Sequence, residues 1–200
     1  MTTLDLKAAF FHVIDDHRWL AASGCAWNLA GPNSANGTKQ EAHQLLPNIV
    51  VMILESLLLH ARSLIDFYTK RQPPSTDILL CDFGLSIDRK LCGELAKYKN
   101  PIEVHLLHLT DWRDRDYRRS HATGKDAKKA RPDWNHDAIL IVSLVFDALK
   151  DVSCQGSKWQ KPFRRLHDAS TERYQNKSSD WPAELGEKSN VEVYLKGLGL

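Results

Sequence analysis

Two histidines stand three residues apart in an apolar stretch of the chain, at His105 and His108. On a helix this spacing places the two imidazoles on neighbouring faces. An imidazole there could act as a general base, contact a phosphate or bind a metal. A metal would need a third ligand, for which the candidates are Asp111 and, from other helices, His12, His17 and His60. We predict a site without a metal or other cofactor.

The alternative is a purely structural role, in which His105 belongs to the core. On a helical wheel it falls between Ile102, Leu109 and Trp112. A histidine in such surroundings is typically held by a hydrogen bond, because a buried polar group needs a partner. The spacing of the two histidines does not separate this alternative from a phosphate contact or a metal ligand.

A basic stretch follows, from residue 113 to residue 131. It holds eight Lys or Arg residues against three Asp residues, a local net charge of +5. Such a patch suits the phosphate backbone of a nucleic acid, and nearby aromatic rings could stack on unpaired bases. The alternative is a solvated helix end, where cations interact favourably with the helix dipole. If the stretch binds nucleic acid, we expect the contacts to come from Arg115, Arg118, Arg119 and His121.

Other motifs in the sequence give weaker indications of function. Asp82-Phe83-Gly84 copies the magnesium-binding triplet of protein kinases, but the glycine-rich loop, strand lysine and H-R-D loop of a kinase are missing. No phosphate-binding P-loop, dinucleotide fingerprint or G-x-S-x-G elbow occurs. The four cysteines, at positions 25, 81, 92 and 154, form no C-x-x-C pair, which argues against a cysteine-based zinc site.

Composition places the chain among ordinary globular proteins. The chain has 200 residues, of which 42% are hydrophobic and 26% charged, with a formal net charge of +2. No overall field therefore indicates nucleic acid or membrane as a partner. The N-terminus lacks a basic segment ahead of its first apolar stretch, and the longest purely apolar run is Ile49–Leu54. We expect a cytoplasmic protein with free thiols and no membrane partner.

The elements that must position these residues are helices. Apolar periodicity predicts helices over 4–22, 41–71, 86–98, 101–118 and 134–151, with Pro47 as a kink or as the true start of the second. Glycine and asparagine predict a loop over 23–37, and Asn100-Pro101 is typical of a helix start. The segment 77–83 is of uncertain type, and only Val191–Leu195 alternates like a strand.

These patterns predict an all-α fold, a bundle of four to five main helices. We expect the bundle domain to span residues 1–151. The remaining residues, 152–200, are polar and interrupted by Gly and Pro, which predicts an irregular C-terminal extension that could pack on the bundle.

One part of the chain, residues 55–113, resembles a known group. The segments concerned are Glu55–Phe67, Asp77–Phe83 and Ile102–Thr110, followed by Arg113. In this order they resemble small bacterial helical proteins near the HEPN superfamily. The resemblance implies a helical bundle that often dimerises and that in many members is a metal-independent ribonuclease of toxin–antitoxin or defence systems.

The HEPN signature is an arginine followed, after four to six residues, by a histidine. The resemblance aligns the histidine with His105 and the arginine with Lys99, which is followed by the polar Asn100. It implies catalytic roles for these residues, with His108 and Arg113 beside them. Lysine keeps the charge of the arginine but lacks its bidentate fork for phosphate. Literal matches to the pattern are Arg115 with His121 and Arg131 with His136.

Two functions therefore remain open. The first is RNA binding or RNA cleavage, in which a histidine removes the 2′-hydroxyl proton and a cation holds the phosphate. The second is a non-catalytic helical module for dimerisation or interaction. We expect a homodimer in either case, with RNA or an unidentified protein as a further partner.

Overall fold

The structure is a computed structural model that describes residues 3–30, 47–71, 77–111, 134–176 and 180–200. These ranges contain no β-strand, and the predicted all-α class is confirmed. Six α-helices and two 3₁₀ helices are described: α1 (Thr3–Ala30), α3 (Pro47–Thr69), η1 (Leu80–Phe83), α4 (Arg89–Asp111), α7 (Trp134–Ser153), α8 (Gln160–Asn176), η2 (Ala183–Leu185) and α9 (Lys188–Gly197).

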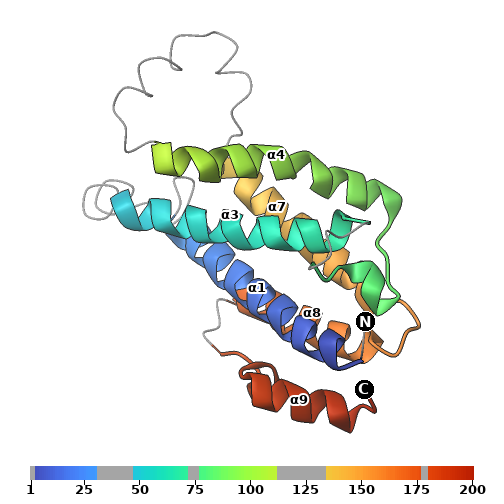
Figure 1. Cartoon of the computed structure of the whole chain (residues 1–200). Coiled ribbons are helices and arrows are strands. Elements are labelled where there is room, and N and C mark those ends of the chain that lie inside the picture. Colours follow the sequence, from blue (N-terminus) through green and yellow to red (C-terminus); the bar gives the residue numbers. More distant parts are fainter. Residues whose placement is uncertain (1–2, 31–46, 72–76, 112–133, 177–179) are drawn as a thin grey trace.

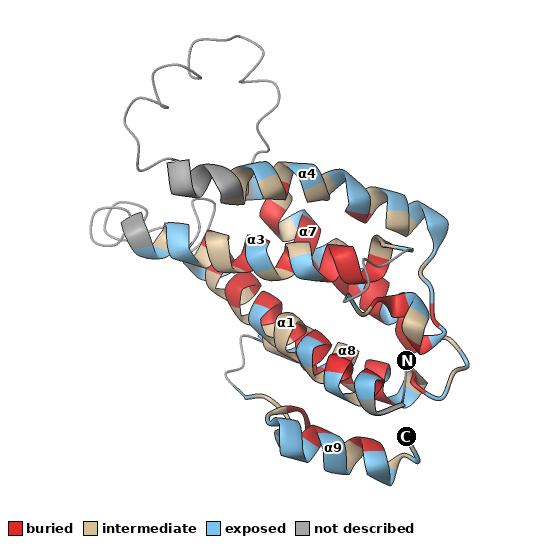
Figure 2. Ribbon diagram, in the orientation of Figure 1, coloured by how far each residue is buried: buried red, intermediate tan, exposed pale blue. Residues whose placement is uncertain are grey.

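Helix α3 lies in the middle of the bundle (Figure 1). It packs against α1 along one flank and α4 along the other, and it also contacts α7. Helix α8 packs against α1 and α7, and α9 contacts α1 and η2. Figure 2 shows that the buried residues lie on the helix faces that point at these neighbours. The candidate functional site lies along the contact between α1 and α3, which we call the seam.

An aromatic cluster joins α1, η1 and the start of α8. The rings of Phe10 in α1 and Phe163 in α8 lie 5.1 Å apart, and those of Phe83 in η1 and Trp159 lie 4.8 Å apart, measured between centroids. All four side chains are buried. Edge-to-face pairs of this kind contribute roughly 0.5–1.5 kcal/mol each beyond the burial of their area. The cluster therefore fixes α8 firmly against α1.

The prediction of an irregular segment over residues 152–200 is wrong, because α8 and α9 form there. The buried residues of α8 include Phe163, Leu166, Ala169 and Ser170, which keep helical spacing along one face. The polar composition of the helix hides this narrow stripe. Val191–Leu195, which alternates like a strand, lies in α9, and its two buried ends are one helical turn apart.

Two other boundaries differ from the predictions. Helix α1 continues to Ala30, so the loop expected from residue 23 does not begin there. Gly24 lies inside this helix, where a Cβ atom would stand 3.1 Å from Tyr174 and 3.2 Å from Val142. This glycine therefore allows a close approach of α1 to α7 and α8 and does not mark a turn.

The two helices predicted over 86–98 and 101–118 are joined in one helix, α4, over the described residues up to Asp111, with Pro101 inside it. Proline in a helix interior removes one hydrogen bond and usually breaks the helix. Here Leu95 and Ile102, seven residues apart and both fully buried, anchor the same face on either side of the proline. Tertiary packing therefore overrides the local signal of Asn100-Pro101.

The kinase-like triplet has a structural role. The Asp82 carboxylate accepts a 2.8 Å hydrogen bond from the Leu79 N–H at the start of η1, and Phe83 enters the aromatic cluster. Gly84 ends the turn with a φ of 70°, a conformation that favours glycine.

No described helix is long and apolar enough to cross a membrane.

Candidate functional site

The residues of the HEPN-like pattern lie on different sides of α4. Lys99 Nζ lies 2.8 Å from Asp66 Oδ1 of α3. His105 Nδ1 accepts a 3.0 Å hydrogen bond from Trp134 Nε1 of α7. Six residues at 3.6 per turn separate their directions by roughly 120°. Asn100, beside Lys99, is exposed. The structure therefore does not bring Lys99 and His105 together.

The hydrogen bond from Trp134 also determines the tautomer of His105. An indole N–H only donates, so Nδ1 must offer its lone pair, and the neutral ring carries its proton on Nε2. The two rings are edge-to-face, 5.1 Å apart, and His105 is half-buried. In this arrangement neither ring nitrogen of neutral His105 is ready to remove a proton from a substrate.

The other predicted site residues fall largely outside the described part of the chain. The backbone of His108 belongs to α4, but its side chain is outside that part. Arg113, Arg115, Arg118, Arg119 and His121 lie wholly outside it.

A different histidine is arranged for proton transfer. His60 Nδ1 of α3 lies 2.8 Å from Asp16 Oδ1 of α1. The second oxygen of the same carboxylate accepts a 2.6 Å hydrogen bond from Ser63 Oγ, one turn further along α3. A carboxylate that accepts from Nδ1–H fixes the tautomer in which Nε2 carries the lone pair. The pair therefore has the geometry of an oriented general base.

Neighbouring residues continue the same seam. Asp16 and Trp19 are three apart on α1, and the Trp19 ring stacks on the His60 ring with centroids 6.2 Å apart and planes at 13°. Trp19 remains 49% exposed, which is high for a tryptophan and leaves aromatic surface open to a ligand. Further along, Ser23 of α1 and Ser56 of α3 lie 3.1 Å apart and close the seam on that side.

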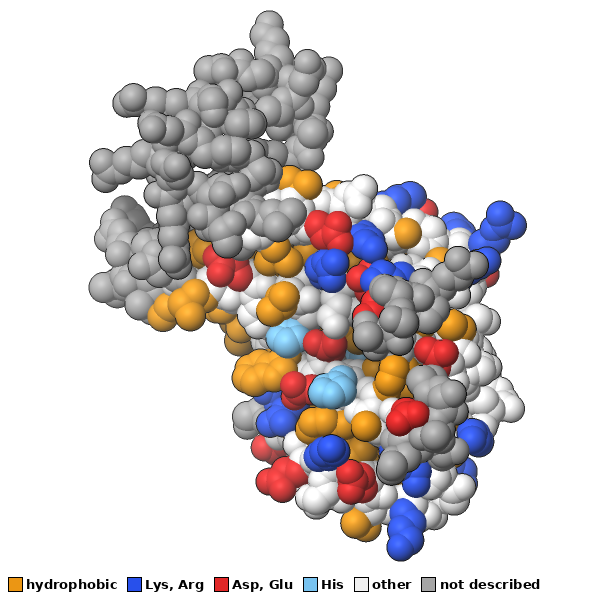
Figure 3. All heavy atoms as spheres, in the orientation of Figure 1, with side chains coloured by type: hydrophobic (Ala, Val, Ile, Leu, Met, Phe, Trp, Pro, Cys, Tyr) orange, Lys and Arg blue, Asp and Glu red, His pale blue; other side chains and the backbone are white. Residues whose placement is uncertain are grey.

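A pocket of about 370 Å³ opens on the other side of Asp16, between α1, α3 and residues 77–79. This volume falls in the usual range for small-molecule sites, about 300–1,000 Å³. His60 is not part of the pocket wall, but it contacts Asp16, which is. Figure 3 shows histidine and acidic side chains gathered over α1 and α3 on this face. The polar and charged wall residues are His12, Asp16, Arg62, Ser63, Asp66 and Asp77.

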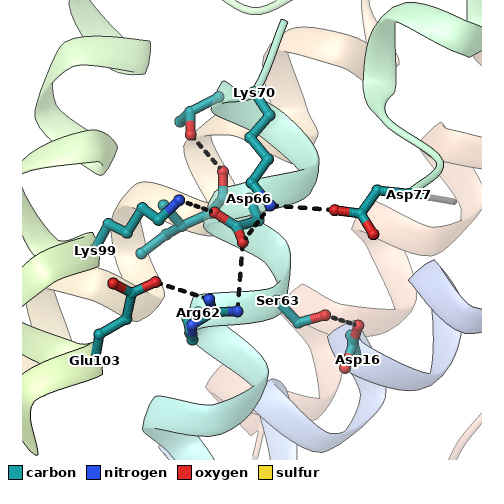
Figure 4. A network of polar contacts seen from close by, with 10 residues as sticks. Asp16, Arg62, Ser63, Asp66, Lys70, Asp77, Lys99 and Glu103 are labelled. Carbon is teal, nitrogen blue, oxygen red and sulfur yellow. Dashed lines mark hydrogen bonds and ion pairs between the residues drawn. The ribbon is translucent and has the colours of Figure 1, made fainter. Parts of the chain in front are cut away.

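Asp66 is the centre of an ion-pair network at the far wall of the pocket (Figure 4). Its carboxylate lies 2.9 Å from Lys70 Nζ, 3.3 Å from Arg62 Nη1 and 2.8 Å from Lys99 Nζ. Burial alone would raise the pKa of Asp66, but the hydrogen bonds and charges of Lys99 and Lys70 outweigh burial and hold this pKa below its usual value. The carboxylate therefore stays ionised at neutral pH and joins α3 to α4.

Two further carboxylates complete the charge balance of this network. Glu103 of α4 accepts a 2.7 Å hydrogen bond from Arg62, and Asp77 lies 3.2 Å from Lys70. Three cations thus face three carboxylates. The hydrogen bond from Lys70 to Asp66 raises the pKa of Lys70, with burial opposing it. The network explains why Lys99 carries a structural contact in this fold.

From the sequence, His12 and His60 stand out only as candidate metal ligands on separate helices. Two signals were available: His12, Asp16 and Trp19 keep helical spacing on α1, and His60 and Ser63 keep it on α3. The sequence does not show that these two rows of residues face each other, because the contact joins residues 44 apart in the chain.

No family model, curated protein or solved structure matches this chain. In the described part of the chain, no group of three or more His, Cys, Asp or Glu residues is arranged to hold a metal ion.

Proposed function

We propose that this protein is a metal-independent endoribonuclease whose general base is His60. The observation that carries the proposal is the hydrogen bond of 2.8 Å between His60 Nδ1 and Asp16, which orients the imidazole and leaves the Nε2 lone pair for a substrate. The proposal keeps the reaction class implied by the HEPN resemblance and places the base on α3, because His105 is engaged by Trp134.

RNA suits a site of this kind because it brings its own nucleophile. A single oriented base that removes the 2′-hydroxyl proton starts the attack on the neighbouring phosphorus. Trp19 offers an exposed ring on which an unpaired base could stack, as aromatic residues do in single-strand binding. Arg62 lies in the pocket wall with its guanidinium paired to Asp66 and Glu103, so a phosphate would compete with these two carboxylates for it. These features support a single-stranded RNA substrate.

The test is an assay of purified protein on single-stranded RNA in the presence of a chelator. We expect fragments ending in a 2′,3′-cyclic phosphate and a 5′-hydroxyl, because the 2′-oxygen is the nucleophile. The matched control is an oligonucleotide with one 2′-deoxy position at the cleaved bond, which should resist cleavage at that bond. Absence of cleavage in RNA, or equal cleavage of the deoxy control, would contradict the proposal.

A second candidate, a non-catalytic interaction module that dimerises, is favoured by the exposed apolar residues of α3. Met52 is 63% exposed and Leu59 55%, and seven residues place them on one helix face. An exposed apolar stripe on a helix is typical of a protein–protein contact. The pocket wall also carries more carboxylates than cations, which suits a polyanion less well.

Light scattering tests this candidate. If α3 forms the dimer contact, the wild type should have twice the mass of one chain at micromolar concentration, and Leu59→Glu should reduce it to one. Ser63→Glu places the same charge at another exposed position of α3, closer to Asp16, and serves as the comparison. A single-chain mass for the wild type would exclude a dimer at these concentrations.

A further inference from the structure

We infer that His12 is the general acid that protonates the leaving 5′-oxygen, in the reaction begun by His60. This inference rests on the proposed function and adds a second catalytic residue to it. His12 is exposed, lines the pocket and lies one helical turn before Asp16 on α1. His60 binds the same Asp16 from α3. His12 and Asp16 therefore line one pocket, and His60 stands beside that pocket through its contact with Asp16.

The other groups of the pocket wall are unsuited to donate this proton. Asp16 accepts hydrogen bonds from both His60 and Ser63, so both of its carboxylate oxygens are already engaged as acceptors. The Ser63 hydroxyl donates to Asp16, and Arg62 keeps its proton at any ordinary pH.

The two remaining carboxylates of the wall are ion-paired. Asp66 lies against Lys70, Arg62 and Lys99, and Asp77 lies against Lys70. Among the described wall residues, His12 is therefore the remaining side chain that can act as a general acid toward a leaving oxygen.

The reaction then balances with two histidines in opposite states. Neutral His60 takes the 2′-hydroxyl proton at Nε2 while the 2′-oxygen forms a bond to phosphorus. The bond from phosphorus to the 5′-oxygen breaks, and the 5′-oxygen takes a proton from the His12 imidazolium. The products are a 2′,3′-cyclic phosphate and a 5′-hydroxyl, with His60 protonated and His12 neutral. Proton exchange with water restores both residues.

The contribution of a general acid depends on the leaving group, and this dependence provides the test. A ribonucleoside 5′-oxygen is a poor leaving group and needs a proton, whereas a para-nitrophenolate leaves without one. We therefore compare a dinucleotide, UpA, with uridine 3′-(para-nitrophenyl phosphate). Loss of a general acid should lower kcat/KM for UpA by about 10²–10⁴-fold and leave the aryl ester within a few-fold of wild type.

Three variants separate the roles. His12→Ala should lose activity on UpA alone, and His60→Ala should lose activity on both substrates, because the base acts before the leaving group departs. Glu192→Ala changes an exposed residue of α9 that is not part of the pocket wall and should act like the wild type on both. Thermal melts of each variant show whether the fold is kept, and His12→Gln replaces His12→Ala if the latter is unstable.

The outcomes distinguish this inference from the proposed function. If His12→Ala lowers activity equally on both substrates, or on neither, His12 is not the general acid, while the function of His60 stands. If His60→Ala keeps full activity, or if the wild type cleaves neither substrate, the proposed function fails and the role of His12 fails with it. Selective loss on UpA supports the inference.

Discussion

Replacing His60 by alanine is expected to lower the rate of RNA cleavage by about 10²–10⁴-fold, because a methyl group cannot accept the 2′-hydroxyl proton. Asp16→Asn should have a comparable effect although the imidazole remains. The amide of asparagine can donate to Nδ1, which would move the proton to Nε2 and remove the lone pair that faces the substrate. The measurement is kcat/KM on single-stranded RNA.

Ser63→Ala is the matched control for these two variants. It removes the 2.6 Å hydrogen bond to Asp16 and leaves the contact between Asp16 and His60 intact. A net hydrogen bond to a charged group is worth about 1.5–3 kcal/mol, so the change should affect stability or orientation without abolishing activity. Wild-type cleavage by His60→Ala, with its fold intact, would disprove the assignment of the base.

The second large effect concerns stability in acid. His17 is fully buried, and its Nε2 lies 2.8 Å from the hydroxyl of Tyr68. Burial lowers the pKa of His17 from 6.5 to about 3, with the charge of Asp16 opposing it. The unfolded chain therefore binds a proton at this residue below pH 6.5, while the folded chain does not.

This difference makes the free energy of unfolding fall as the pH falls through the window from 6.5 to about 3. The slope is about 1.4 kcal/mol per pH unit for one proton, which amounts to roughly 5 kcal/mol over the whole window. Above pH 6.5 both states hold neutral His17, and this contribution to the pH dependence vanishes. Urea titrations between pH 7 and pH 4.5 measure it, in a range above the pKa of Asp66.

His17→Gln isolates the effect, because glutamine keeps a polar group beside Tyr68 and does not titrate. The variant will lose some stability at pH 7 but should show a flatter pH dependence than the wild type between pH 6.5 and 4.5. Parallel curves for the two proteins would show that His17 is accessible to protons in the folded state.

Local pattern determined the class of fold and part of the helix set. The helix predicted over 134–151 corresponds closely to α7, Trp134–Ser153, because helical periodicity is a local property of the sequence. Signals of the same local kind failed at Gly24 and at Asn100-Pro101. At both places the outcome depends on distant residues: Tyr174 packs close to Gly24, and buried Leu95 and Ile102 hold α4 through its proline.

The candidate site shows the same division. The amino-acid sequence by itself supplied the histidines and carboxylates, and the HEPN resemblance paired Lys99 with His105. The tertiary structure decided their partners: Lys99 forms an ion pair with Asp66, and His105 accepts a hydrogen bond from Trp134. The pairing of Asp16 with His60 depends on which faces of α1 and α3 meet. Contacts between residues far apart in the chain determine which helix faces meet, and the spacing of residues within one helix does not determine it.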